Sequence, residues 1–140
     1  MRNILGDHVA QAGSNVTPGK FRFDFSHTEK VSQEELDEIF ALSNSAVFED
    51  YEVNTNIMNI DEAKNEGALA FFGDKYEDDV RVVNIGDFSK ELCGGTHVHN
   101  SHDVGLIVLL QESSIGSNLR RVEMLSGKPV SYTHLTLPTS

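Results

Sequence analysis

Hydrophobic residues recur with a period of two over short stretches of this 140-residue chain, and this pattern limits its fold more than any other feature. Phenylalanine occupies every second position of Phe21–Phe25, with Arg22 and Asp24 between, which predicts a β-strand with one buried aromatic face. Similar patterns predict further strands over residues 52–60, 80–85, 104–110 and 119–125. The strand over 104–110 is so continuously apolar that we expect both of its faces to be buried.

Helical patterns separate these strands. Ser32 and Glu35 have the spacing of a capping box, and the apolar stripe that follows predicts a helix of about 18 residues from Gln33. A shorter helix is expected from Asp61 to Glu66. Residues 1–11 have the pattern of the last turns of a helix that would end at Gly13. The sequence therefore predicts an α+β fold, with a mixed or antiparallel sheet packed against helices.

The charge balance excludes several kinds of protein. The chain has 11 Lys and Arg against 22 Asp and Glu, a formal net charge of −11. A basic nucleic-acid module needs clustered cations, so we expect no DNA partner, and an anionic membrane surface would repel this chain. The single cysteine, Cys93, excludes an internal disulfide and suits a reducing compartment. We expect a cytoplasmic protein.

The last twelve residues, 129–140, differ from the rest in composition. They contain no Asp, Glu, Lys or Arg and two of the three prolines. The string SYTHLTLPT resembles translated sequencing-adapter read-through, whereas the alternative is a flexible chain end. We expect the folded unit to be residues 1–128.

The chemistry of the sequence concentrates around Cys93 and His97. A thiolate and an imidazole separated by three residues suit one Zn²⁺, and Gly94 and Gly95 allow a tight turn between them. Two ligands are half of a structural zinc site. The alternatives are a free cysteine beside a loop histidine without a role, or a nucleophilic Cys–His pair. His99 and His102 are further candidate ligands, although a polar turn explains them equally well.

Paired arginines near the end of the chain offer another candidate contact. Arg120 and Arg121 could contact phosphate, although two arginines beside Glu123 more often form a solvated face.

The segment Gly86–Val98, with its string GDFSKELCGGTHV, closely resembles the second metal-ligand motif of the alanyl-tRNA synthetase family. Other segments match signatures of this family in the same order, so the resemblance covers residues 2–127. They are Leu5–Ser14, Arg22–His27, Thr55–Met58, Phe72–Tyr76, Glu112–Gly116 and Arg120–Glu123.

The resemblance implies the editing domain of that family, the second additional domain shared with threonyl-tRNA synthetases. In the family this domain hydrolyses the ester of serine or glycine wrongly loaded onto alanine tRNA. It implies one zinc ion, with Cys93 and His97 as one ligand pair, and a place for Gln11 in the editing pocket. The implied partners are the aminoacylated 3′ end of alanine tRNA and the amino acids alanine, serine and glycine. The parent enzyme would attach alanine with ATP and magnesium in a catalytic domain outside this chain.

The sequence departs from the family pattern in one respect. The first ligand pair, His-x-x-x-His, would lie upstream of Met1, and neither His8 nor His27 has the spacing to replace it. We therefore expect an editing domain truncated at its N-terminus that binds zinc poorly and is inactive alone, because two ligands forfeit most of the affinity.

Two other functions stay open. One is a free-standing deacylase that edits in trans, or the related editing module of threonyl-tRNA synthetase. The segment 71–83 and the string RFDFSH favour the full synthetase over this alternative. The other is a non-catalytic zinc-binding module in which Cys93 and His97 are only structural.

Overall fold

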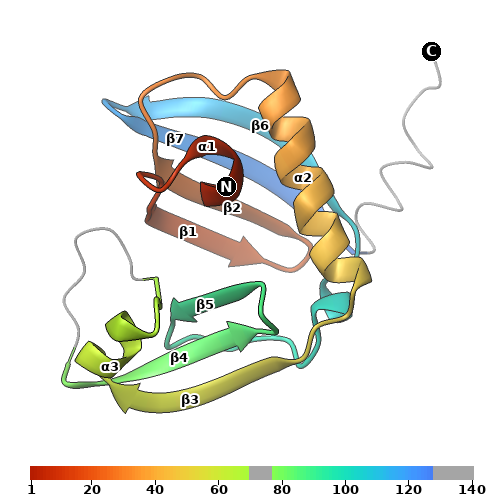
Figure 1. Cartoon of the computed structure of the whole chain (residues 1–140). Coiled ribbons are helices and arrows are strands. Elements are labelled where there is room, and N and C mark those ends of the chain that lie inside the picture. The colour runs from red at the N-terminus through yellow and green to blue at the C-terminus, as the bar shows by residue number, and fades with distance from the viewer. Residues whose placement is uncertain (70–76, 128–140) are drawn as a thin grey trace.

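The computed structural model describes residues 1–69 and 77–127, which form two antiparallel sheets with helices (Figure 1). The larger sheet has the strand order β1-β2-β7-β6, and the smaller has the order β3-β4-β5. The predicted α+β class is confirmed. The larger sheet consists of β1 (Gln11–Thr17), β2 (Lys20–Ser26), β6 (Ile107–Gly116) and β7 (Leu119–Ser126), and the smaller of β3 (Val53–Asn59), β4 (Asp79–Ile85) and β5 (Ser89–Leu92).

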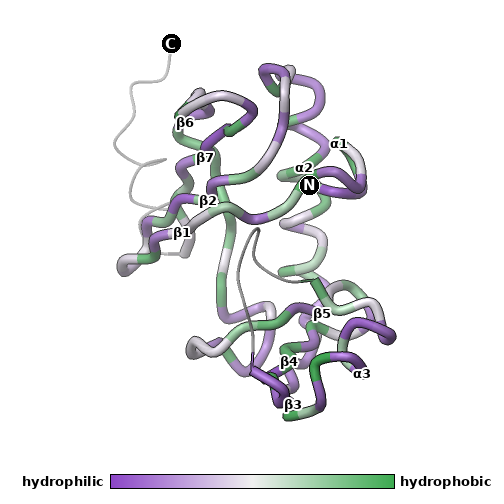
Figure 2. Tube along the Cα trace, turned by 90° about the vertical axis from the view of Figure 1, so that its left-hand side faces the viewer, coloured by the Kyte–Doolittle hydropathy of each residue, from purple (hydrophilic) through white to green (hydrophobic). Residues whose placement is uncertain are grey.

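Helices α1 (Arg2–Leu5) and α2 (Gln33–Phe48) cover one face of the larger sheet (Figures 1 and 2). Leu36 and Ile39 of α2 pack there against the strand residues Phe25 and Val122. Because Phe25 and Val122 are fully buried, this cluster is the main hydrophobic core.

The start of α2 is the one that the sequence predicts. The Ser32 side chain accepts a hydrogen bond from the backbone N–H of Glu35, and the Glu35 carboxylate accepts one from the N–H of Ser32. The helix ends at Phe48, slightly earlier than expected, because Asp50 adopts a left-handed conformation with φ of 55°.

The smaller sheet has its own core. Helix α3 (Ile60–Asn65) brings Ala63 against Val80, Val82 and Leu92. The side chain of Asn59 accepts from the N–H of Asp61, so the cap lies two residues before the predicted one.

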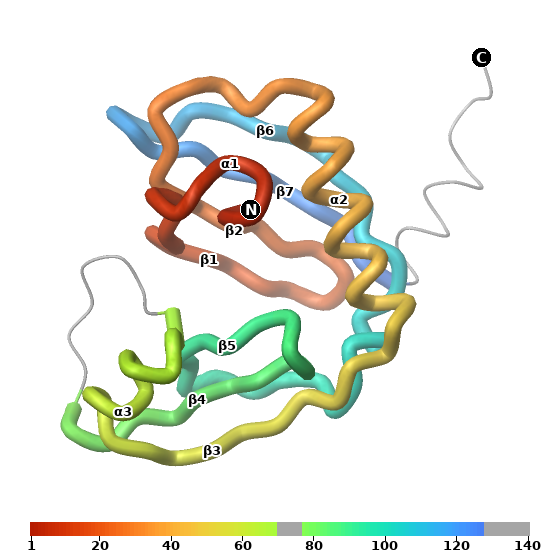
Figure 3. Tube along the Cα trace, viewed as in Figure 1, coloured from red at the N-terminus to blue at the C-terminus, as the bar shows by residue number. Residues whose placement is uncertain are grey.

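Ser101, at the start of the 3₁₀ helix η1 (Ser101–Val104), joins the two sheet units. Its hydroxyl donates to the carbonyl oxygen of Ala46 in α2 (2.7 Å) and accepts from the N–H of Tyr51 (2.7 Å) just before β3. Figure 3 shows η1 beside the end of α2, where the chain passes between the two sheets.

Several expectations about secondary structure are wrong. The N-terminal helix ends at Leu5 rather than near Gly13, because Gly6 leaves the helical conformation and Gln11 begins β1. The strand expected over 104–110 begins at Ile107, and it is not buried on both faces, since Leu106 is 52% exposed and Leu110 47%. Strands β1 and β5 were not predicted, because neither has a clear apolar alternation.

The matched segment Phe72–Tyr76 and the tail 129–140 lie outside the described residues. Among the described helices, none has the length and apolar character to span a bilayer.

Candidate functional site

Cys93 lies directly after β5, at the start of a turn that is held by Arg81 of β4. The backbone N–H of Cys93 donates to the carbonyl oxygen of Arg81 (3.1 Å). The Arg81 guanidinium reaches past it, and Nη1 donates to the carbonyl oxygens of Gly94 (3.1 Å) and Gly95 (2.7 Å). One residue therefore fixes three consecutive residues of the turn, including the predicted ligand Cys93.

This arrangement also orients the other side of the turn. In a trans peptide the C=O and the following N–H point in opposite directions. Because the carbonyls of Gly94 and Gly95 face Arg81, the N–H groups of Gly95 and Thr96 point away from the guanidinium. These two N–H groups have no hydrogen-bond acceptor within the described ranges. The turn therefore presents two neighbouring backbone donors.

Both predicted metal ligands are accessible on this turn. Cys93 is half-buried and His97 is exposed. A hollow of about 340 Å³ adjoins the thiol and is lined by Arg81, Cys93 and Gly94, with Glu77 and Asp79 at its edge. The Cys93 side chain can therefore be reached by a ligand.

The donor types at this turn suit zinc, but their number falls short. Thiolate and imidazole are the usual ligands of a structural or catalytic zinc ion, which takes three or four protein donors. Within residues 1–69 and 77–127, no group of three or more His, Cys, Asp or Glu side chains is arranged to hold a metal ion. Cys93 and His97 are two donors of the right chemical type, which is fewer than a complete zinc site needs.

Gln11, the predicted pocket residue, lies at an irregularity of the larger sheet. It is the first residue of β1, opposite Phe25, and the register with β2 shifts between Gln11 and Gly13. β-Bulges of this kind redirect a side chain and often lie beside active sites. Gln11 is half-buried.

The Met1 amino group precedes α1 and is partly buried, within range of the charge of Glu91 on β5. Burial lowers the pKa of the Met1 amino group, and the Glu91 carboxylate opposes this effect by attracting the charged form. Glu91 stands two residues before Cys93.

Two histidines that the sequence left without a role form a pair. His8 Nε2 lies 2.7 Å from His27 Nδ1, and the two rings are stacked. The hydroxyl of Ser26 joins this region by donating to the carbonyl oxygen of His8 (2.9 Å) and accepting from the N–H of Ala10 (2.9 Å). These contacts fix the segment just before Gln11.

The other two candidate histidines, His99 and His102, belong to no group of three or more potential metal ligands among the described residues. His99 is exposed, and its carbonyl oxygen accepts from the N–H of Val53. His102 is exposed in η1, where its N–H donates to Asp50.

Arg120 and Arg121 are committed to ion pairs within the larger sheet rather than free for phosphate or exposed as a solvated face. Arg120 binds the buried carboxylate of Glu112, which also accepts from the N–H of Val31. Arg121 holds both oxygens of the buried Asp24, at 2.7 and 3.1 Å. The hydrogen bond to Asp24 raises the pKa of Arg121, so this side chain stays charged.

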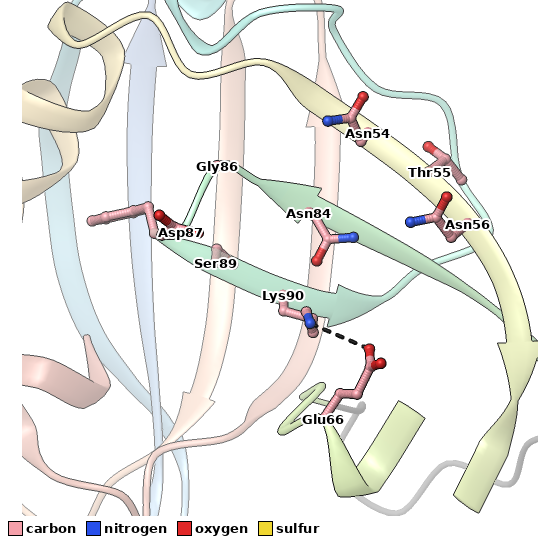
Figure 4. A pocket seen from close by; sticks show the side chains of 10 residues that line it. Asn54, Thr55, Asn56, Glu66, Asn84, Gly86, Asp87, Ser89 and Lys90 are labelled. Atoms are coloured by element: carbon pink, nitrogen blue, oxygen red, sulfur yellow. Dashed lines mark hydrogen bonds and ion pairs between the residues drawn. The ribbon is translucent and has the colours of Figure 1, made fainter. Parts of the chain in front are cut away.

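A second and larger hollow, of about 760 Å³, lies on the smaller sheet (Figure 4). Its lining is mostly polar and comes from β3, β4, β5 and the turn between β4 and β5. Asn54, Asn56, Asn84, Asp87 and Lys90 are its main side chains, and Lys90 forms an ion pair with Glu66 (3.3 Å). Sequence reasoning missed this site, because its asparagines are scattered along the chain.

Comparison with known proteins identifies related sequences for nearly the whole chain. Residues 80–123 match the family described as the threonyl and alanyl tRNA synthetase second additional domain. The chain is 48% identical to the alanine–tRNA ligase of Clostridioides difficile over 135 residues, which is 96% of this chain and 15% of that protein. It is 53% identical to the alanine–tRNA ligase of Streptomyces avermitilis over 127 residues, or 91% of this chain and 14% of that protein.

A third relative, the alanine–tRNA ligase of Lysinibacillus sphaericus, is 51% identical over 128 residues, again 91% of this chain and 14% of that protein. The resemblance to alanyl-tRNA synthetases is therefore confirmed. The chain spans only 14–15% of the length of these curated relatives.

Proposed function

Since the chain is homologous to a segment of alanine–tRNA ligases, we propose that it is part of such a ligase and that residues 1–128 belong to its editing domain. In this proposal, the domain hydrolyses the ester bond of alanine tRNA that carries serine or glycine. An editing step is chemically reasonable, because a pocket for alanine alone discriminates poorly against amino acids of similar size.

The observation that supports this proposal best is the turn held by Arg81. Hydrolysis of an aminoacyl ester passes through a tetrahedral state with a developing oxyanion, which preorganised N–H donors stabilise. Arg81 fixes the Gly94 and Gly95 carbonyls, so the N–H groups of Gly95 and Thr96 point away from the guanidinium. We assign to these two donors the binding of the ester carbonyl oxygen.

Zinc fits this proposal through the side chains of the same turn. Cys93 and His97 would hold the ion, together with ligands from the segment that precedes Met1 in a longer parent. A bound zinc ion supplies either an activated water or a polarised ester carbonyl.

Gln11 is the residue that we assign to substrate orientation. Its amide can both donate and accept hydrogen bonds, which suits the hydroxyl of a seryl ester or the ribose that carries it. The bulge in β1 and the contacts among Ser26, His8 and Ala10 fix the backbone on either side of it. Gln11 therefore needs little reorganisation to bind.

The test compares the 140-residue chain with the same chain extended by the preceding segment of the Clostridioides difficile relative. We expect the extended protein to bind about one zinc ion and to deacylate seryl alanine tRNA, and the unextended chain to do neither well. Zinc content is measured by elemental analysis, and deacylation by the release of labelled serine.

Variants of the extended protein separate the roles. Cys93→Ala and His97→Ala should both lower zinc content and deacylation, whereas His102→Ala is the matched control and should preserve both. Gln11→Ala should reduce deacylation and leave the zinc content unchanged. Full deacylation by both the Cys93 and His97 variants would overturn the proposal.

A further inference from the structure

The polar hollow on the smaller sheet is built by a row of side chains across three strands. Asn54 of β3 is paired in register with Asn84 of β4, and Asn84 with Lys90 of β5. Directly paired residues have side chains about 5 Å apart on the same face. Figure 4 shows this row, with Asn56 beside Asn54 along β3. We call the hollow the amide trough, formed by Asn54, Asn56, Asn84, Asp87, Phe88 and Lys90.

The trough continues a face of the sheet that is otherwise covered. Val82 and Leu92, two residues further along β4 and β5, lie on the same face and are buried under α3. Helix α3 ends at Asn65, and beyond it the Glu66 carboxylate pairs with the Lys90 ammonium, while the N–H of Leu69 donates to the Lys90 carbonyl oxygen. Half of this face is therefore packed and apolar, while the other half is open and polar.

The amides of the trough can act as donors and acceptors toward a ligand. Within residues 1–69 and 77–127, no hydrogen bond joins the side chains of Asn54, Asn56 or Asn84 to another residue. Each amide offers two donors and an acceptor with two lone pairs. Three such groups provide the mixed donor and acceptor pattern that the edge of a nucleobase requires.

An aromatic ring borders one end of the trough. Phe88 is 41% exposed, and its ring stacks on that of Tyr51 with a centroid distance of 6.1 Å. Tyr51 in turn packs over Gly86, whose missing Cβ would lie 2.7 Å from Tyr51 Cδ1. The position of Phe88 is therefore fixed, and an exposed fixed ring is a surface on which a base can stack.

We propose that the amide trough binds one single-stranded ribonucleotide of an RNA end. The asparagine amides pair with the base edge, Phe88 lies beside the base, and Lys90 contacts the phosphodiester. Asp87 accepts a hydrogen bond from a ribose hydroxyl, which is a frequent role of acidic side chains in nucleotide sites. DNA lacks the 2′-hydroxyl, so the trough prefers RNA.

The charges limit the ligand to a nucleotide with one phosphodiester. Lys90 is the only cation among the trough residues, and Glu66 already pairs with it. A nucleoside triphosphate would place several negative charges near Asp87 and Glu66, which disfavours it. A weak and local contact of this kind fits a chain with a net charge of −11, which does not attract RNA as a whole.

This inference rests on the proposed function only in the choice of RNA, since a tRNA whose ester is hydrolysed presents a single-stranded 3′ end. The trough is lined by residues other than Cys93, His97 and Gln11. Binding to the trough can therefore fail while zinc-dependent deacylation persists, and the reverse is equally possible.

The probe is the single-stranded RNA trinucleotide CCA, titrated into the ¹⁵N-labelled 140-residue chain, with the DNA trinucleotide and inorganic phosphate as comparisons. We expect shifts in the amide signals of β3, β4 and the turn around Phe88, and in the side-chain NH₂ signals of Asn54 and Asn84. The DNA trinucleotide should bind several-fold more weakly, and phosphate should perturb only Lys90.

Two pairs of variants make the assignment specific. Asn84→Asp should weaken RNA binding about fivefold, because it replaces donors by a negative acceptor, while Asn15→Asp on β1 should change nothing. Lys90→Ala should lower the slope of log affinity against log salt by about one, in contrast to Lys20→Ala on β2. Each Asp or Ala variant is checked for an unchanged spectrum outside its own strand.

The proposal is overturned if CCA causes no shifts at millimolar concentration, if the shifts lie on the larger sheet, or if RNA and DNA bind equally. It is also overturned if Asn84→Asp and Asn15→Asp have the same effect. Deacylation by the extended protein is measured separately, and its presence or absence leaves this test unchanged.

Discussion

Arg121 of β7 holds both carboxylate oxygens of Asp24, which lies 97 positions earlier in the sequence, on β2. Asp24 is buried, and its Oδ2 would lie 3.3 Å from a Cβ at Gly13 of β1. This ion pair thus joins β2 and β7, the two central strands of the larger sheet, and Gly13 of β1 packs beside it. It lies beneath the bulge that carries Gln11.

We expect Asp24→Ala to lower the free energy of unfolding by about 2 kcal/mol, because Arg121 loses a charge-assisted, bidentate partner. The loss is limited because Arg121 is partly exposed and can be rehydrated. The measurement is urea unfolding followed by circular dichroism. Asp7→Ala is the control, because Asp7 is 95% exposed in its 3.8 Å pair with Arg2 and should cost less than about 0.5 kcal/mol. Equal losses would contradict this account.

The role of Arg81 predicts a local loss of order. In Arg81→Ala the backbone bond from Cys93 to residue 81 persists, but the carbonyls of Gly94 and Gly95 lose their donor. We expect the ¹H–¹⁵N NOE to fall at Gly94, Gly95 and Thr96 and to stay unchanged at Leu92.

Arg2→Ala serves as the matched control for this experiment. Arg2 also donates through Nη1 to a backbone carbonyl, that of Val9 (2.9 Å), but far from the turn in sequence. Its removal should leave the NOE values of residues 94–96 unchanged. A rigid turn in Arg81→Ala would show that the glycines hold their conformation without the guanidinium.

Alanine variants of two glycines separate the energetic cost of a strained backbone from that of a steric clash. Gly86 (φ +50°) and Gly67 (φ +83°) both have left-handed backbones, but a Cβ at residue 86 would strike Tyr51, whereas nothing lies within 4 Å of one at residue 67. Gly67→Ala should cost about 1 kcal/mol for the backbone alone. Gly86→Ala should cost clearly more in thermal unfolding and should shift the Phe88 ring signals, because Tyr51 must move.

The capping box of α2 predicts a pH dependence. Hydrogen bonds from the backbone and the side chain of Ser32 lower the pKa of Glu35 below its usual 4.5. A lowered folded pKa means that this contribution to stability is present above pH 4.5 and is lost as the pH falls through the folded value. Glu35→Gln can still accept from Ser32, so it should flatten the stability profile below pH 4.5 without abolishing the cap. If the stability of Glu35→Gln falls below pH 4.5 as steeply as that of the unaltered chain, this assignment is wrong.

Five of the seven strands and the long helix could be predicted because their signals are local. The phenylalanines of 21–25 and the Ser32–Glu35 spacing act within a few residues, and they gave β2 and the start of α2 correctly. Strand β1 was missed because its residues Gln11–Thr17 are mostly polar and exposed, so only pairing with β2 keeps them extended. Strand β5 was missed because it has only 4 residues, and its extended conformation depends on pairing with β4.

The candidate site was only partly predictable. Cys93 and His97 are close in sequence, so their spacing alone indicated metal chemistry. The function of Arg81 was not visible, because it depends on the register that places β4 beside the end of β5. The Asn54–Asn84–Lys90 row was hidden for the same reason: sequence separations of 30 and 6 residues become one line only after the strands pair.

The position of Ser101 has a consequence for how the chain opens. The two hydrophobic clusters share no residue, and Ser101 ties α2 to the segments on either side of the smaller sheet. A chain with two separate cores, joined through a few hydrogen bonds around Ser101, has two cooperative units, which can exchange their amide hydrogens at different rates. Slow exchange in β2 and β7, with faster exchange in β3 and β4, would follow from the larger and smaller cores. Loss of the Ser101 hydroxyl would then widen the gap between the two rates by releasing the smaller unit first.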